Sequence, residues 1–148
     1  MRERNLDLLF NPKSIALIGA SATPFKWGSL IPLNILKGNY QGNVFPVNPG
    51  LETMLGHRCY PSVADIPGPV DMALIFTPAP TVPGIVEQCG EKGVHSLVII
   101  TADFSETGPA GAAMEAEVLE KARQLGLRLV GPNSKGLFSS QTQLHALM

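Results

Sequence analysis

The chain has 148 residues, of which 45% are hydrophobic and 16% are charged, and its formal net charge is −1. This length predicts one domain over residues 1–148, and the apolar excess is typical of α/β proteins whose central strands are covered on both faces. The sequence has no basic run, so its electrostatics give no support for a nucleic-acid partner. Its apolar runs are too short for a membrane span.

The chain contains two cysteines, Cys59 and Cys89, which are widely spaced and belong to no CxxC or Cys/His cluster. This spacing argues against zinc and against a disulfide framework, so we expect free thiols in the cytoplasm. The first seven residues carry charges and lack an apolar core, and we therefore expect no secretory signal there.

Short apolar strands alternate with helices along the chain. The first strand is predicted at Ser14–Ile18, after a short helix or turn at residues 6–10. Ser29 offers an N-cap side chain to a helix at residues 30–39, and Thr81 offers one to a helix that runs to Lys92. Another helix is predicted at residues 110–125, and further strands at residues 44–47, 71–76, 96–100 and 127–130.

Several local features refine these elements. Pro46 places the second strand toward a sheet edge or a bulge, and Ser62-Val63-Ala64-Asp65 predicts a brief helical turn. Glu117 and Lys121 form a favourable i,i+4 pair on the last helix. The final dozen residues contain one short apolar piece, Leu137-Phe138, and then an expected polar tail with no obvious closure.

Five such strands alternating with helices predict a Rossmann-like, doubly wound parallel sheet in three layers, α/β/α, with right-handed crossovers. Ligands of such sheets bind at the carboxyl ends of the strands, where the strand order switches. The turns expected at these ends are rich in small and polar residues: 19–21, 48–50, 77–80, 101–103 and 131–134. We therefore expect the site on this rim.

The first of these turns has the character of a phosphate cradle, because small residues leave backbone N–H groups exposed at a strand end. An NAD-binding fold requires G-x-G-x-x-G there and an acidic residue after the second strand. Position 21 is Ser, and Asn48 and Pro49 stand where the acid is required. An NAD(P)-binding oxidoreductase or redox-sensing domain is therefore the alternative function, and a scaffold that binds no ligand and docks neighbouring domains is a third.

Six short motifs occur in one order: Ile18-Gly19-Ala20-Ser21, Pro24-x-Lys26-x-Gly28, Val47-Asn48-Pro49, Gly56-x-Arg58-x-Tyr60-Pro61-Ser62, Phe76-Thr77-Pro78-Ala79 and Gly131-Pro132-Asn133-Ser134-x-Gly136. Together they resemble the CoA-binding domain that opens NDP-forming (ADP-forming) acyl-CoA synthetases. That domain is similar to the N-terminal domain of the succinyl-CoA synthetase α subunit. The resemblance covers nearly the whole chain.

The resemblance implies a binding site for CoA or acyl-CoA. It places the CoA phosphates at Gly19, Ala20, Ser21 and Lys26, the adenosine portion at Asn48 and Pro49, and the pantetheine path along Thr77, Pro78 and Ala79, with the loop at residues 100–104, which includes Thr101, as another wall. Many relatives carry a Lys directly after Asn-Pro, where this chain has Gly50. Arg58 or Lys26 is the expected replacement at the 3′-phosphate.

The resemblance also implies parts that this sequence does not contain. Such synthetases pass a phosphoryl group through a His in a second domain, which an ATP-grasp portion follows, and His57, His95 and His145 do not match that His. We therefore expect a binding module, cut out of a longer protein or standing alone, that is not catalytic by itself. Its expected partners are further domains or subunits of a synthetase, or an acetyltransferase that carries this region as a sensor.

Three further features leave two interpretations open. Phe25 and Trp27 either stack on adenine or pack against the neighbouring helix. Asp103 and Glu106 are acid/base groups or belong to a solvated loop. Cys59 is a structural thiol or forms a disulfide with CoA.

Overall fold

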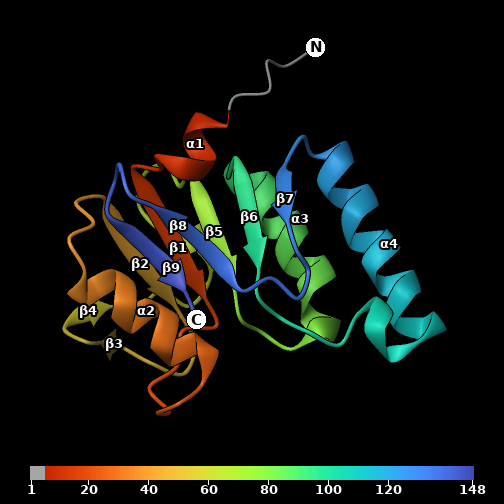
Figure 1. Ribbon diagram of the computed structural model, residues 1–148, viewed down its shortest axis with the longest axis horizontal. Helices are drawn as coiled ribbons and strands as arrows, with labels where there is room; N and C mark the ends of the chain where they lie inside the picture. Colours follow the sequence, from red (N-terminus) through yellow and green to blue (C-terminus); the bar gives the residue numbers. More distant parts are fainter. Residues whose placement is uncertain (1–5) are drawn as a thin grey trace.

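The computed structural model describes residues 6–148. Of residues 1–7, where no secretory signal is expected, residues 1–5 lie outside the described part. Its centre is a five-stranded parallel sheet in the order β2-β1-β5-β6-β7 (Figure 1). The strands are β1 Ser14–Ile18, β2 Asn43–Val47, β5 Met72–Ile75, β6 Ser96–Ile99 and β7 Arg128–Val130. All five predicted strands are confirmed, with boundaries that differ by no more than one residue.

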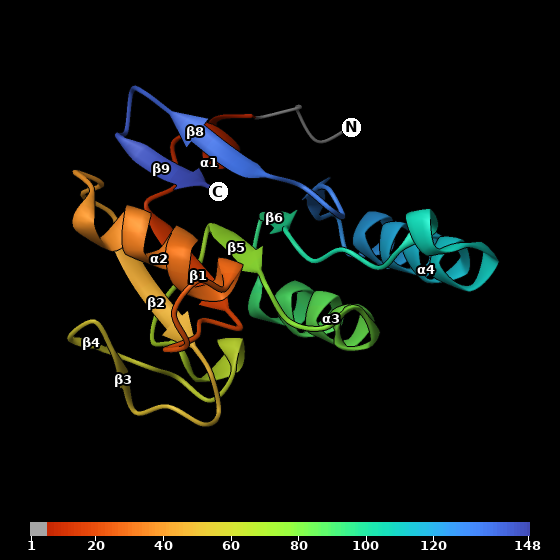
Figure 2. The ribbon, with the colours of Figure 1, turned by 60° about the horizontal axis from the view of Figure 1, so that its bottom comes forward.

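Helices cover both faces of the sheet. These are α2 Trp27–Lys37, α3 Val82–Lys92 and α4 Pro109–Gln124, with a short α1 at Asp7–Phe10. Figure 2 shows α3 and α4 on one face and α1 and α2 on the other. Successive residues of β1 accordingly enter different cores, Ala16 toward α3 and α4 and Leu17 toward α2. The predicted doubly wound α/β/α architecture is confirmed.

The middle strands are almost entirely apolar because neither of their faces meets water. Every residue of β1, β5 and β6 is buried, including Ser14 and Ser96 at their starts. β2 is an edge strand, as Pro46 predicts, because a residue without an N–H weakens a central ladder.

The predicted start of the second helix is wrong. α2 begins at Trp27 with Lys26 as its N-cap residue, and Ser29 lies inside the first turn, where its hydroxyl donates to the Lys26 carbonyl oxygen over 2.8 Å. Thr81 is the N-cap residue of α3, but its hydroxyl donates to the Pro78 carbonyl oxygen and caps no N–H group. Both hydroxyls bond to a local carbonyl oxygen, an alternative that competes with capping.

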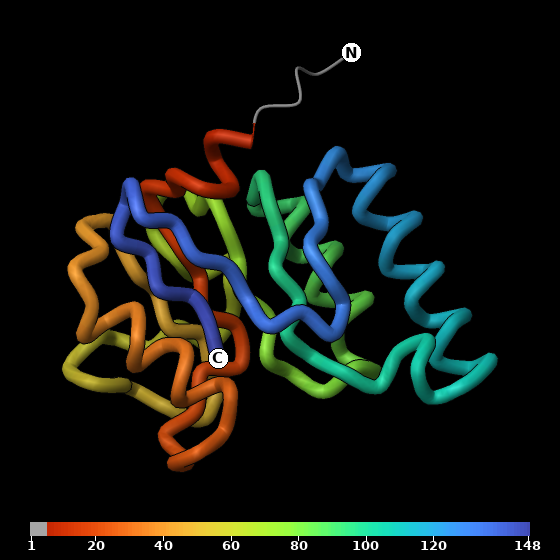
Figure 3. The backbone as a smooth tube through the Cα atoms, viewed as in Figure 1, coloured from red at the N-terminus to blue at the C-terminus, as the bar shows by residue number. Residues whose placement is uncertain are grey.

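The expectation of a polar tail at the end of the chain is also wrong. Strands β8 Gly136–Ser139 and β9 Leu144–Leu147 form an antiparallel hairpin. Figure 3 shows this segment crossing back from β7 over the face of the sheet that α2 also covers. Leu137, Leu144 and Ala146 are buried there in the same core as α2. The hairpin is therefore part of the second helical layer.

The connection between β2 and β5 contains a small hairpin, β3 Thr53–Met54 and β4 His57–Arg58, which the sequence patterns did not predict. The predicted brief turn after it is confirmed as a 3₁₀ helix at Val63–Asp65, closed by a capping box between Ser62 and Asp65. Two more 3₁₀ turns, Ala79–Thr81 and Ser105–Thr107, follow β5 and β6.

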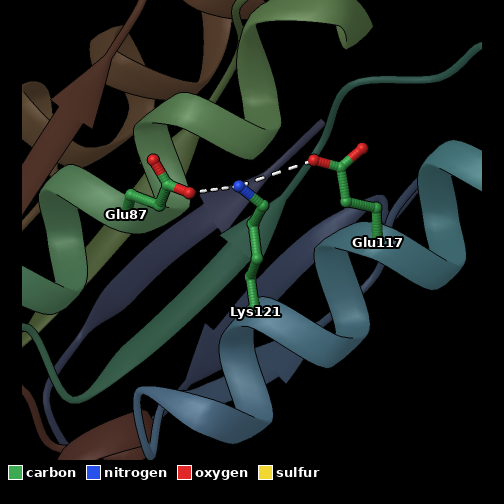
Figure 4. Close-up of polar contacts among 3 residues, drawn as sticks. All are labelled: Glu87, Glu117 and Lys121. Atoms are coloured by element: carbon green, nitrogen blue, oxygen red, sulfur yellow. Dashed lines mark hydrogen bonds and ion pairs between the residues drawn. The ribbon is translucent and has the colours of Figure 1, made fainter.

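An ion-pair cluster joins the two helices of one layer. The Lys121 ammonium on α4 lies 3.5 Å from Oε1 of Glu117, as the i,i+4 spacing predicts, and also contacts Glu87 on α3 (Figure 4). The Lys121–Glu87 pair joins residues that are farther apart in the sequence, and it links α4 to α3. Within residues 6–148, no helix has the length and apolar character needed to cross a membrane.

Candidate functional site

A cleft of about 1290 Å³ lies at the carboxyl ends of β1, β2, β5 and β6. After β1 the chain turns to β2 on one side, and it then returns to β5 on the other side of β1. The loops that follow β1 and β5 consequently diverge, which is how a doubly wound sheet forms a crevice. Both loops lie toward the lower edge of the view in Figure 1. The site therefore lies on the predicted rim.

The first loop folds closely against its neighbours. Gly19 has a φ of +89°, and a Cβ built on it would lie 2.9 Å from Cγ2 of Thr77. A Cβ on Gly28, at the start of α2, would lie 2.6 Å from the Gly19 carbonyl oxygen. The Ser21 N–H donates to the Gly28 carbonyl oxygen over 2.7 Å, and the N–H groups of Gly19 and Ala20 donate to the carbonyl oxygens of Val47 and Leu17. The expectation that this turn leaves its backbone N–H groups exposed is therefore wrong. Only glycine fits at these two positions, so the loop brings its backbone and the start of α2 together at the cleft.

The Asn48 side chain joins the loop after β2 to the loop after β1. Its Nδ2 donates to the Ala20 carbonyl oxygen over 2.7 Å, and its Oδ1 accepts the Gly50 N–H over 2.7 Å. The Gly19 N–H also donates to the Val47 carbonyl oxygen. The two loops are thus held at a fixed separation by bonds that span 28 residues of sequence.

Two threonines form the wall that β5 and β6 contribute. The Thr101 hydroxyl donates to the carbonyl oxygen of Thr77 over 2.7 Å and lies 3.3 Å from that of Ile75. The Thr77 hydroxyl oxygen is buried and has no hydrogen-bond partner among the described residues. A buried hydroxyl without a partner is uncommon and costs free energy.

The charges at the cleft are few. Among the described residues that line it, Lys26 is the one cation and Asp103 the one anion. Beside the cleft, backbone N–H groups from Glu106 itself, Asp103 and Phe104 lower the pKa of the Glu106 carboxyl. Glu106 accepts the Asp103 N–H over 2.6 Å, and the Asn133 amide lies 3.5 Å from the same oxygen. These contacts favour a structural role for Glu106 in the loop after β6.

The structure brings most of the predicted site residues together. Those that line the cleft are Gly19, Ser21, Lys26, Asn48, Pro49, Thr77, Pro78, Ala79 and Thr101. Ala20 is fully buried in the core beneath the loop and presents only its carbonyl oxygen to Asn48. Arg58 lies on β4 and does not line the cleft; its guanidinium carbon is 5.2 Å from the centroid of the Tyr60 ring.

Both aromatic residues near the first loop line the cleft. Phe25 is 88% exposed and has a φ of +63°, and Trp27 is 49% exposed. The interpretation that Phe25 packs against the neighbouring helix is wrong, because its side chain is exposed. Trp27 is also partly exposed. Their exposed faces are available to a planar ligand at the mouth of the cleft.

Sequence reasoning missed one wall of the cleft. It consists of side chains from the first 3₁₀ turn, α3 and α4, namely Val63, Ile85, Gln88 and Met114. Helical spacing marks some of them as apolar, but no local pattern shows that they face a ligand site. Only the packing of α3 and α4 against the sheet places them there.

Neither cysteine is exposed to the cleft. Both thiols are free and buried, as the expectation of free thiols requires, and burial raises both pKa values. A raised pKa lowers the thiolate fraction, which is the reactive form. Within the described residues, no group of three or more His, Cys, Asp or Glu side chains is placed to hold a metal ion.

Comparison with known proteins identifies the family. Residues 13–139 match the family described as CoA binding domain. The chain is 44% identical over 133 residues to the ADP-forming acetate–CoA ligase II of Archaeoglobus fulgidus, covering 90% of this chain and 20% of that protein. It is also 44% identical to the α subunit of the ADP-forming acetate–CoA ligase I of Pyrococcus furiosus, covering 96% of this chain and 32% of that subunit.

A solved structure shows the same fold. It is the dinucleotide-forming acetyl-coenzyme A synthetase 1 of Candidatus Korarchaeum cryptofilum, in complex with phosphate and ADP. Its TM-score is 0.92 at 40% identity, and the match covers 97% of this chain and 30% of that one. The chain thus spans between a fifth and a third of the length of these relatives. It belongs to the CoA-binding domain family, as its motifs predict.

Proposed function

We propose that this chain binds CoA or acyl-CoA in the cleft and serves as the N-terminal CoA-binding module of an ADP-forming acyl-CoA synthetase. The observation that carries this proposal is the convergence of the predicted residues from four strand ends on one cleft at the switch point of the sheet. Because these residues are far apart in the sequence, only the fold brings them together. The family match supports the same proposal.

The first loop and the start of α2 suit the CoA diphosphate. Glycines at positions 19 and 28 let the backbone approach a ligand closely, and the N-terminus of α2 carries a partial positive charge. Lys26 supplies the full positive charge among the described cleft residues. We assign the phosphates to Gly19, Ser21 and Lys26.

The wall formed by residues 77–79 suits the pantetheine arm. Pantetheine alternates amide groups with apolar methylenes, so its path needs a mainly apolar wall with a few polar positions. Pro78, Ala79, Ile85 and Met114 provide apolar surface. Thr77 and Thr101, which also line the cleft, are the polar residues of this wall.

Recognition of the 3′-phosphate is assigned to Lys26 in preference to Arg58. Lys26 lines the cleft, whereas Arg58 lies over the Tyr60 ring and does not line the cleft. Gly50, which stands where many relatives carry Lys, adds no charge. The adenine is assigned to the mouth of the cleft, beside Pro49 and the exposed rings of Phe25 and Trp27.

The chain contributes binding, and the phosphoryl-transfer chemistry belongs to other parts of the parent enzyme. The relatives that it matches are ADP-forming ligases three to five times its length. These relatives favour a synthetase, with its ATP-grasp portion as the partner, over an acetyltransferase. No observation in the cleft favours NAD(P) over CoA.

Isothermal titration of the chain with CoA tests the proposal. We expect saturable binding that Ser21→Trp abolishes, because the indole would fill the cleft at the first loop. Ser140→Trp, in the exposed turn of the β8–β9 hairpin, is the matched control and should bind as the wild type does. Absence of saturation by the wild type at millimolar CoA, or tighter binding of NADH than of CoA, would refute the proposal.

A further inference from the structure

We infer that Asn48 is a positioning residue, whose side chain clamps the first loop in the shape that receives the CoA phosphates. The family resemblance assigns Asn48 to contact with the adenosine portion. The geometry assigns its amide to the backbone of two loops instead. This inference rests on the proposed function, because it explains how the cleft acquires affinity for CoA.

Both ends of the Asn48 amide are bonded to main-chain atoms. Its Nδ2 donates to the Ala20 carbonyl oxygen, and its Oδ1 accepts the Gly50 N–H, each over 2.7 Å. The Asn48 N–H donates to the Tyr60 carbonyl oxygen over 3.0 Å, which anchors the residue to the segment after the β3–β4 hairpin. Two hydrogen bonds therefore hold the side chain in one orientation, and a third holds the backbone of the same residue.

The bond to Ala20 fixes a whole peptide unit of the first loop. The Ala20 carbonyl and the Ser21 N–H belong to one planar trans peptide, so they point in opposite directions. Asn48 holds the carbonyl end, and the Gly28 carbonyl oxygen accepts the Ser21 N–H at the other end over 2.7 Å. Rotation of this peptide breaks both bonds. Asn48 thus sets the orientation of the loop that faces the start of α2.

The donor of this clamp is what a single substitution can remove and restore. Asn48→Asp keeps the shape of the side chain and an acceptor for Gly50, but its ionised carboxylate has no hydrogen for the Ala20 oxygen. Protonation of that carboxyl supplies an O–H donor again. Contact with a carbonyl oxygen and partial burial both raise the pKa of the introduced carboxyl, since they disfavour its charged form.

The test is a titration of CoA against wild type, Asn48→Asp and Asn48→Ala between about pH 8 and about pH 4.5. At the upper pH we expect Asn48→Asp to bind CoA about tenfold more weakly than wild type. At the lower pH its affinity should return to within about threefold of the wild-type value, whereas Asn48→Ala stays weak throughout. Lys26 and Asp103, the charged residues that line the cleft, are present in all three proteins. Dividing the CoA affinity of each variant by the wild-type affinity at the same pH therefore removes any pH dependence that the three proteins share.

A matched control and a measurement without CoA complete the design. Asn39→Asp adds the same charge at an exposed position before β2, at the opposite end of the sheet, and should show no pH-dependent loss relative to wild type. In the free protein, exchange of the Ser21 amide should be faster in Asn48→Asp than in wild type at high pH, and equal to it at low pH.

The outcomes separate the two proposals. If wild type does not bind CoA, the proposed function fails, and the exchange rates of Ser21 still decide whether Asn48 clamps the loop. If wild type binds CoA but Asn48→Asp matches it at high pH, or is equally weak at both pH values, the positioning role is wrong.

Discussion

The hydroxyl of Thr101 donates a hydrogen bond to the carbonyl oxygen of Thr77 over 2.7 Å, between the carboxyl ends of β6 and β5. The same hydroxyl lies 3.3 Å from the Ile75 carbonyl oxygen, at the last residue of β5. These contacts extend the parallel pairing of the two strands into the loops that line the cleft. The wall assigned to the pantetheine arm therefore depends on a side chain from the neighbouring strand end.

Thr101→Val should weaken CoA binding, because Val has the shape of Thr but leaves the Thr77 carbonyl without this donor. We expect about a fivefold loss of affinity and a loss of about 1 kcal/mol in the free energy of unfolding, and calorimetry and urea denaturation measure the two. Thr101→Ser retains the hydroxyl and should keep most of the affinity. Equal affinities of the Val and Ser variants would show that the hydroxyl is not needed.

Gly19→Ala should lower the free energy of unfolding by more than the cost of placing Ala at a positive φ, because the new side chain would also meet neighbouring atoms. The new Cβ would lie 2.9 Å from Cγ2 and 3.0 Å from the backbone nitrogen of Thr77. Gly56→Ala is the matched control, since Gly56 has a similar φ of +80° and a Cβ added there would meet no atom within 4 Å. We expect about 1 kcal/mol of destabilisation for Gly56→Ala and at least about 2 kcal/mol for Gly19→Ala. Similar losses in urea denaturation would contradict the close approach.

Stability should fall at alkaline pH through the Cys89 thiol. Burial raises the pKa of Cys89 from its ordinary value of 9.0 to about 12. Below pH 9 the thiol is neutral in both the folded and the unfolded chain, so its contribution is fully present there. As the pH rises toward 12, the unfolded chain ionises first and the contribution is lost.

The comparison with Cys89→Ala isolates this effect from other groups that titrate at high pH. The difference in unfolding free energy between wild type and Cys89→Ala should shrink above pH 9, by roughly 1.4 kcal/mol for each pH unit. A difference that stays constant between about pH 8 and about pH 11 would be inconsistent with a buried neutral thiol.

Glu106 should contribute to stability at neutral pH and lose that contribution in acid. Hydrogen bonds from backbone N–H groups lower the pKa of the Glu106 carboxyl from its ordinary value of 4.5, and the largest effect comes from the N–H of Glu106 itself. A lowered pKa means that the contribution is present above pH 4.5 and disappears as the pH falls through the folded-state pKa. The stability difference between wild type and Glu106→Gln should therefore narrow below pH 4.5. A difference that stays constant between about pH 7 and about pH 3 would contradict a stabilised Glu106 carboxylate.

The sequence by itself determines the parallel sheet and the rim that carries the site. Continuous apolar segments such as Ser14–Ile18 form strands because a strand buried on both faces has no polar side. Strands that alternate with helices form a parallel, doubly wound sheet. Proteins with such a sheet bind their ligands at the carboxyl ends of the strands. These inferences need only local composition and the period of the pattern, which is why the five strands and the rim could be predicted. The nine predicted residues that line the cleft were implied by the family resemblance.

The tertiary structure decides what depends on distant partners. The pattern of residues 136–147 does not predict a hairpin, because its strands pack against elements that are distant in the sequence, β9 against α2 and β8 against α1 and β6. Local sequence likewise cannot show that the Asn48 amide bonds to Ala20, or that Arg58 stacks over Tyr60 outside the cleft. Chain composition thus specifies where a ligand can bind, and long-range packing specifies which side chains face it and which hold the loops in place.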